Sequence, residues 1–98
     1  MQDLRPTIEG AWENRNLLQE SGTQKAIRAV VSALDSGELR VAEPTADGWQ
    51  VNEWVKKAVV LYFPIQKMET IEVPPFEFHD KIPLKTGYAA KGVRVVPH

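Results

Sequence analysis

The stretch TQKAIRAVVSALDSG, residues 23 to 37, contains the clearest helical pattern in the sequence and gives the fold its helical character. Thr23 is a good N-cap residue, and Gly37 stands where a left-handed C-terminal cap is expected. We therefore predict a helix from about Thr23 to Asp35. Its large apolar side chains recur at i, i+3, i+4 and i+7, and Lys25, Arg28 and Ser32 fall on the other side; the apolar set is Ile27, Val30, Val31 and Leu34.

A second helical pattern precedes this one and runs from about Asp3 to Leu17. Asp3 is a plausible N-cap, and Pro6 is compatible with a first turn, whose N–H groups make no intrahelical bonds. The QESG stretch, residues 19 to 22, is predicted to be a short connection. One stripe of the helix is apolar and consists of Leu4, Ile8, Ala11 and Trp12.

Beyond Gly37 the apolar period changes to two, which favours strands. Residues 44 to 48, PTADG, contain a proline and an Asp-Gly pair and are typical of a hairpin turn, so we predict a hairpin over about residues 39 to 51. A two-stranded hairpin is marginally stable alone in water, so we expect its apolar side chains to lie on the helices. These side chains are Leu39, Val41, Trp49 and Val51.

A third helix is predicted to begin after Asn52, a natural N-cap residue. Lys56 and Lys57 are expected to project away from the core, and Pro64 should end the helix at Phe63, because the residue before a proline avoids helical geometry. The expected core face consists of Trp54, Val55, Ala58, Val59 and Tyr62.

After Pro64 the pattern is less regular. Residues 66 to 91 are predicted to be mostly irregular or short extended pieces, whereas residues 92 to 98, GVRVVPH, alternate like a strand. That strand has nothing to pair with, so we expect the natural chain to continue past His98. The predicted class is α+β and mainly helical, with three or possibly four helices and one hairpin. Residues 1 to 91 would form a helical domain and residues 92 to 98 the start of another.

Composition limits the classes of function. The chain of 98 residues has room for one small domain, and its net charge of −1 excludes nucleic-acid binding driven by bulk charge. It has no cysteine, which excludes disulfides and thiolate chemistry. Its longest apolar run is far shorter than the roughly 20 residues that span a bilayer. We expect a cytoplasmic protein that binds neither nucleic acid nor membrane.

Candidates for a self-contained active site are few. His79 and Asp80 could act as a base and its orienting acid, but neighbours on an extended segment point to opposite faces, so a polar loop pair is the better interpretation. No metal-binding spacing and no glycine-rich phosphate loop occurs. The Lys56-Lys57 pair could attract an anion or simply be solvated. Base stacking or core packing could explain the three tryptophans, and packing is favoured.

Arg94 lies among valines in the terminal strand pattern, so its guanidinium needs a polar partner. An arginine in such a setting is suited to holding a carboxylate through two parallel hydrogen bonds. An outward-facing arginine in water is the alternative, and spacing alone does not separate the two.

Four blocks of sequence follow one another in an order that resembles a known family. They are LDSGELRVAE, WVKKAVVLYF, HDKIPLK and GVRVVP, at residues 34 to 43, 54 to 63, 79 to 85 and 92 to 97. Together they resemble the amino-terminal portion of bacterial 2,3,4,5-tetrahydropyridine-2,6-dicarboxylate N-succinyltransferases, also called tetrahydrodipicolinate succinylases. The resemblance extends over essentially the whole chain.

The resemblance implies an acyltransferase of lysine and diaminopimelate biosynthesis, which moves succinyl from the co-substrate succinyl-CoA to 2-amino-6-oxopimelate. In that family a left-handed parallel β-helix of hexapeptide repeats follows the amino-terminal domain, assembles as a homotrimer and carries the catalytic groups and coenzyme A groove. The repeat pattern is absent here. The resemblance therefore implies a chain that is inactive alone, with no catalytic residue, metal or bound cofactor of its own.

One functional position carries over through the resemblance: Arg94 matches the family's substrate-binding arginine, and the substrate is a dicarboxylate. Lys81 and Lys85 of the HDKIPLK block either add positive potential near that dianion or keep a loop soluble. A different class of function, an independent non-catalytic protein-interaction module, stays open at this point.

Overall fold

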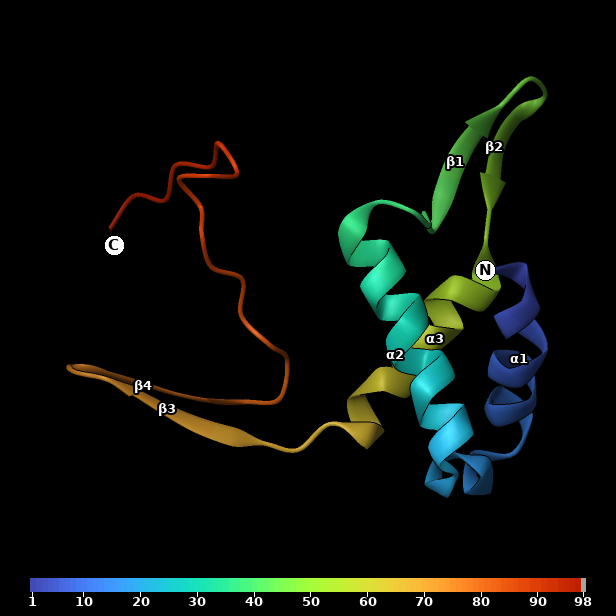
Figure 1. The fold of residues 1–98 in the computed structure, drawn as a ribbon, viewed down its shortest axis with the longest axis horizontal. Helices are drawn as coiled ribbons and strands as arrows, with labels where there is room; N and C mark the ends of the chain where they lie inside the picture. Colours follow the sequence, from blue (N-terminus) through green and yellow to red (C-terminus); the bar gives the residue numbers. More distant parts are fainter. Residues whose placement is uncertain (98) are drawn as a thin grey trace. The chain divides into compact units, whose positions relative to one another are not determined.

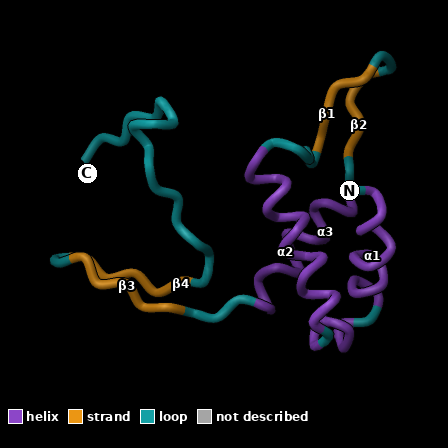
Figure 2. Tube along the Cα trace, viewed as in Figure 1, coloured by secondary structure: helices purple, strands orange, loops and turns teal. Residues whose placement is uncertain are grey.

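The computed structural model describes residues 1–97 and divides the chain into two compact units, Met1–Lys67 and a second that begins at Met68 (Figure 1). The first unit contains α1 (Arg5–Glu13), α2 (Ser21–Ser36), β1 (Ala42–Thr45), β2 (Gly48–Val51) and α3 (Glu53–Ile65), and the second contains β3 (Glu69–Val73) and β4 (Phe76–Asp80). Figure 2 shows which segments are helix and which are strand. The predicted α+β, mainly helical class with three α-helices is confirmed.

The core of the first unit lies where α3 packs against both α1 and α2 (Figure 1). Each helix contributes an apolar face close to the one that its spacing predicts, and α3 supplies the largest side chain of the buried set, Trp54. Burial of this apolar surface is the main stabilising term of the fold. The buried apolar residues are Ile8, Ala11, Leu18, Ala26, Ile27, Val30, Ala33, Trp54, Val55, Ala58 and Leu61.

The first predicted helix is shorter than expected. It ends at Glu13 because Asn14 is extended, at φ −133° and ψ 97°, and accepts a hydrogen bond on its side chain from the Asn16 N–H at 3.2 Å. A 3₁₀ turn, Arg15–Gln19, follows. The N-cap role predicted for Asp3 is wrong: its carboxylate lies 3.2 Å from the Met1 ammonium group, and this hydrogen bond lowers the pKa of the Asp3 carboxyl.

Helix α2 begins two residues earlier than predicted, at Ser21. Thr23 is therefore buried inside the first turn instead of capping it, and residues 21 and 22 belong to the helix. The carbonyl of Leu18 accepts a 2.7 Å hydrogen bond from the Gln24 side chain, which fixes the turn before the helix. At the other end the prediction is confirmed, because Gly37 has φ 85° and its N–H donates to the Leu34 carbonyl.

The β1–β2 hairpin is confirmed, but its predicted packing is wrong for β2. Trp49 and Val51 are 72% and 61% exposed, because the strands extend away from the helices (Figure 1). Leu39 and Val41, just before β1, do pack against the core. The hairpin is thus held at its base, and its tip turns at Gly48, which has φ 116°.

The second hairpin, β3–β4, falls where irregular structure or short extended pieces are predicted, so the extended pieces are present but their pairing into a hairpin was not predicted. Its strands pair antiparallel across the cis Pro74–Pro75 bond. Residues 93–97, predicted as a strand, form no regular secondary structure, because a strand needs a hydrogen-bonded neighbour and none lies beside them within residues 1–97. His98 lies outside the described residues, and the domain boundary predicted at residue 92 stays a prediction.

Helix α3 continues through Pro64 and ends at Ile65, so the predicted end at Phe63 is wrong. The Arg28 guanidinium of α2 explains the two extra residues: its Nη2 donates to the Ile65 carbonyl at 3.0 Å and to the Gln66 side chain at 3.3 Å. A proline in the last turn removes only one hydrogen bond, and the contact from α2 offsets that loss.

Replacing Arg28 by alanine should therefore lower the free energy of unfolding by about 0.5 to 1.5 kcal/mol, the typical net value of an exposed hydrogen bond. Urea denaturation followed by circular dichroism would measure the change. Lys25→Ala, at another exposed position of α2, is the matched control and should change stability by less than about 0.5 kcal/mol. Equal losses in both variants would contradict the capping role of Arg28.

Candidate functional site

Arg94, the one residue predicted to bind substrate, is exposed and follows a tight turn. The turn over residues 88–91 is closed by hydrogen bonds from the N–H of Lys91 and of Val93 to the Tyr88 carbonyl, at 3.1 and 2.9 Å. Gly92 ends it with φ 70°, a left-handed conformation that glycine adopts without strain. Within residues 1–97 no hydrogen bond or ion pair engages the Arg94 guanidinium, and its role in substrate binding stays a prediction.

His79 and Asp80 both lie in β4, where successive side chains point to opposite faces. The His79 Nδ1 atom lies 2.9 Å from the Thr70 hydroxyl of β3, and Asp80 stands opposite Glu69. The structure therefore does not bring the two residues together as a base and its acid, as the alternation predicted.

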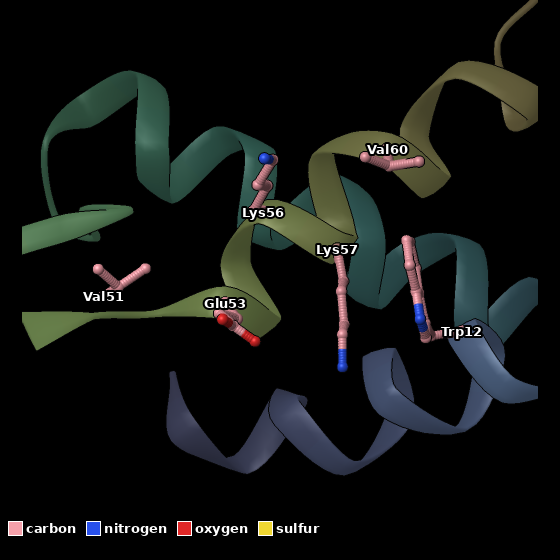
Figure 3. A pocket seen from close by; sticks show the side chains of 6 residues that line it. All are labelled: Trp12, Val51, Glu53, Lys56, Lys57 and Val60. Atoms are coloured by element: carbon pink, nitrogen blue, oxygen red, sulfur yellow. The ribbon is translucent and has the colours of Figure 1, made fainter.

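A hollow of about 330 Å³ lies on the first unit, between α1 and α3 and beside the end of β2 (Figure 3). Its sides combine apolar and charged groups: Trp12 from α1, Val51 from β2, and Glu53, Lys56, Lys57 and Val60 from α3. Sequence reasoning missed this hollow, because its lining residues come from three elements whose packing had to be known first.

The two lysines of α3 differ in their surroundings. Lys57 extends towards α1, where its Nζ lies 2.9 Å from the Glu9 carboxylate and 5.6 Å from the Trp12 ring (Figure 3). Lys57 was predicted to project away from the core, but it lies against α1, where its neighbour is an acid. Lys56 is exposed, as predicted. The Trp12 ring also lies 4.8 Å from the Arg15 guanidinium, so two cations lie close to it.

Residues 1–97 contain neither a metal-binding cluster nor a membrane-spanning helix. Among them, no group of three or more histidine, cysteine, aspartate or glutamate side chains could hold a metal ion. None of the helices described is both long enough and apolar enough to cross a bilayer.

Comparison with known proteins identifies the family. The family model described as the N-terminal domain of tetrahydrodipicolinate N-succinyltransferase matches residues 3–65. Three relatives are named 2,3,4,5-tetrahydropyridine-2,6-dicarboxylate N-succinyltransferase. The protein of Bordetella petrii is 46% identical over 97% of this chain, that of Alkalilimnicola ehrlichii 46% over 99%, and that of Coxiella burnetii (strain Dugway) 41% over 100%.

The similarity extends over the whole chain but only part of each relative. The chain spans 38% of the length of the Bordetella petrii protein and 39% of the length of the other two. The matched region contains all three α-helices and the β1–β2 hairpin that the structure describes. This chain therefore belongs to the family of tetrahydrodipicolinate N-succinyltransferase amino-terminal domains.

Proposed function

We propose that this chain is the amino-terminal domain of an enzyme that transfers succinyl from succinyl-CoA to 2-amino-6-oxopimelate in lysine and diaminopimelate biosynthesis. The single observation that supports this most is the 41–46% identity, over nearly all of the chain, to proteins named as N-succinyltransferases of tetrahydropyridine dicarboxylate. In the complete enzyme we propose a cytoplasmic homotrimer, and we propose that the groups that act on the thioester lie in the part of the relatives beyond this chain.

In the proposed reaction the substrate amine attacks the thioester carbonyl carbon. A C–N amide bond forms, the C–S bond breaks, and coenzyme A leaves as its thiol. A general base must take the proton that the amine loses and pass it to the leaving sulfur. We assign no such base in this chain, and we assign it no bound cofactor or metal.

The proposed contribution of this chain is to bind one carboxylate of the dicarboxylate substrate through Arg94. A guanidinium presents two parallel N–H donors that match the two oxygens of a carboxylate. The guanidinium of Arg94 supports this role, because it is exposed after the turn at residues 88–91 and has no hydrogen-bond partner among residues 1–97.

A chimera tests the enzymatic proposal. This chain would replace the matching 38% of the Bordetella petrii relative, and release of the coenzyme A thiol would be followed with both substrates present. The chimera should transfer succinyl, whereas the 98-residue chain alone should not. A chimera that folds and assembles like the intact relative but transfers no succinyl would contradict the proposal.

Within the active chimera, Arg94→Ala should raise the KM for the dicarboxylate by about 10- to 100-fold, because a charge-assisted bidentate hydrogen bond is lost. The KM for succinyl-CoA should change by less than about 2-fold, since uniform loss of acceptor binding leaves the donor site intact. Arg94→Lys should recover part of the loss, and Arg5→Ala, at an exposed position of α1, is the control. A rise confined to the KM for succinyl-CoA would assign Arg94 to the donor instead.

A further inference from the structure

A short exposed segment joins the two compact units of the chain. Lys67 is the last residue of the first unit and Met68 the first residue of the second, and both lie between the end of α3 and the start of β3. Within residues 1–97 the structure gives neither of them a hydrogen bond or an ion pair. Exposed backbone with so few contacts changes conformation at little cost in free energy.

The two residues just before this segment are held in place. The Gln66 N–H donates to the Phe63 carbonyl at 3.2 Å. The Arg28 Nη2 of α2 donates to the Ile65 carbonyl at 3.0 Å and to the Gln66 side chain at 3.3 Å. Ile65 and Gln66 are also half-buried, whereas Lys67 is exposed. The part of α3 that hydrogen bonds hold to the first unit therefore ends at Gln66.

The Arg28 guanidinium is itself held by Gln24, which lies one turn earlier in α2. The Arg28 Nη1 donates to the Gln24 Oε1 at 3.3 Å, and the Gln24 Nε2 donates to the Leu18 carbonyl at 2.7 Å. Because a guanidinium is planar, a bond to one of its terminal nitrogens orients the other. Gln24 thus directs Arg28 towards the end of α3, although among the described residues its own side chain bonds only to Leu18 and Arg28.

Pro64 weakens the end of α3 and gives this contact its importance. The last carbonyls of a helix have no intrahelical partner, and a proline in the last turn also lacks an N–H donor. Without a donor from α2, this turn should fray back to Phe63. The free chain before Glu69 would then grow from three residue steps (66 to 69) to six (63 to 69), and its greatest span from about 10 to about 20 Å.

We propose that Gln24 and Arg28 form a clamp that fixes the end of α3 and confines the bend between the two units to Lys67 and Met68. The clamp limits how far the second unit, which contains Arg94, can move from the helices. It is a conformational device of this chain, and it does not depend on the succinyl transfer proposed above.

Nuclear magnetic resonance relaxation of the ¹⁵N-labelled 98-residue chain locates the bend. The Gln66 amide should have an order parameter near about 0.85, as in rigid backbone, and the amides of Lys67 and Met68 should fall below about 0.6. In Arg28→Ala the mobile region should extend back to Ile65. Equal order parameters at residues 66, 67 and 68 of the wild-type chain would overturn the proposal.

Hydrogen exchange of the Gln66 amide proton tests the clamp itself. Arg28→Ala should speed this exchange by about 2- to 10-fold, the effect of losing exposed hydrogen bonds. Gln24→Ala should speed it too, although Gln24 makes no bond to Gln66 in the structure. The double variant should exchange no faster than Arg28→Ala, because the two side chains act as a unit. Lys25→Ala, at a neighbouring exposed position, is the control and should leave the rate unchanged.

Gln24→Glu separates the clamp from general stabilisation of α2. A glutamate keeps an acceptor for Arg28 at a spacing of four residues but loses the donor to Leu18, so exchange at Gln66 should stay within about 2-fold of the wild-type rate. The amide protons of α2 should keep their protection in every variant, so that faster exchange at Gln66 does not report global unfolding.

Three exchange results would overturn the proposal. The first is an unchanged rate at Gln66 in Arg28→Ala, which would mean that Pro64 needs no contact from α2. The second is an unchanged rate in Gln24→Ala, which would mean that Gln24 does not orient Arg28. The third is a rate in Gln24→Glu as fast as that in Gln24→Ala, which would mean that the acceptor at residue 24 has no role. None of these measurements involves succinyl transfer, so the enzymatic proposal keeps its own test.

Discussion

Replacing Trp54 by alanine is expected to lower the free energy of unfolding by about 3 to 5 kcal/mol, more than any other single substitution that we propose. The Trp54 side chain is 2% exposed and belongs to the buried cluster between the three helices. Truncation would remove its apolar burial and leave a cavity among neighbours that are already closely packed. Because small domains are stable by only about 5 to 15 kcal/mol, the variant should be close to unfolding at physiological temperature.

Two further tryptophan variants serve as controls for this prediction. Trp49→Ala removes the same atoms from a side chain that is 72% exposed, and it should change stability by less than about 1 kcal/mol. Trp54→Phe should cost much less than Trp54→Ala, because the buried Trp54 Nε1–H finds no acceptor among residues 1–97 and phenylalanine has no donor to leave unsatisfied. Urea unfolding monitored by circular dichroism measures all three, and equal losses in Trp49→Ala and Trp54→Ala would contradict the assigned core.

The tryptophans also show how far sequence reasoning reaches. Trp54 lies on a helical stripe whose partners, α1 and α2, are themselves predicted, so its burial was predicted correctly. Trp49 was assigned to the core by alternation in a strand, and this was wrong. Alternation shows which side chains share a face of a hairpin, but it does not show whether the hairpin lies on the helices or extends from them.

The presence of each helix was predictable from the sequence, but the residue at which it ends was not. Periodic apolar side chains select a helix over many residues, whereas each end depends on one or two contacts. The Arg28 guanidinium extends α3 past Pro64 from another helix, and the Asn14 side chain ends α1 early. Contacts between residues 37 positions apart are not visible in local spacing.

The sequence signals for the second hairpin and for Arg94 are weaker than those for the helices. The pairs Ile71-Val73 and Phe76-Phe78 each alternate with a glutamate, and the two prolines between them mark a turn, so the signal for β3–β4 was present. Each run is very short, so the pairing of the two strands was not predicted. The Arg94 assignment came from resemblance, since an exposed arginine after a turn has no local signature of substrate binding.

Asn52→Leu should lower the free energy of unfolding by about 2 to 4 kcal/mol, because buried polar groups that lose their partners remain unsatisfied. Asn52 was predicted to cap α3, and it does occupy the N-cap position, but its side chain makes no capping hydrogen bond. The amide Nδ2 donates instead to the Arg40 carbonyl at 2.8 Å and to the Glu43 carboxylate at 3.2 Å, and Oδ1 accepts from the Gln50 Nε2 at 3.1 Å.

These three bonds join both strands of the β1–β2 hairpin and the segment before β1 to the start of α3, so their loss should free the hairpin before the helices unfold. Hydrogen exchange should therefore show the amide protons of residues 42–51 losing protection in Asn52→Leu while those of α2 keep theirs. Asn52→Asp preserves the shape but places a second carboxylate beside Glu43 and removes the donor to Arg40, so at neutral pH it should be as damaging as leucine. Gln50→Ala removes one of these bonds and should cost about 0.5 to 1.5 kcal/mol. If the aspartate variant were as stable as the wild-type chain, the donor role of Asn52 would be wrong, because aspartate keeps the shape of the side chain but loses the donor and adds a negative charge beside Glu43.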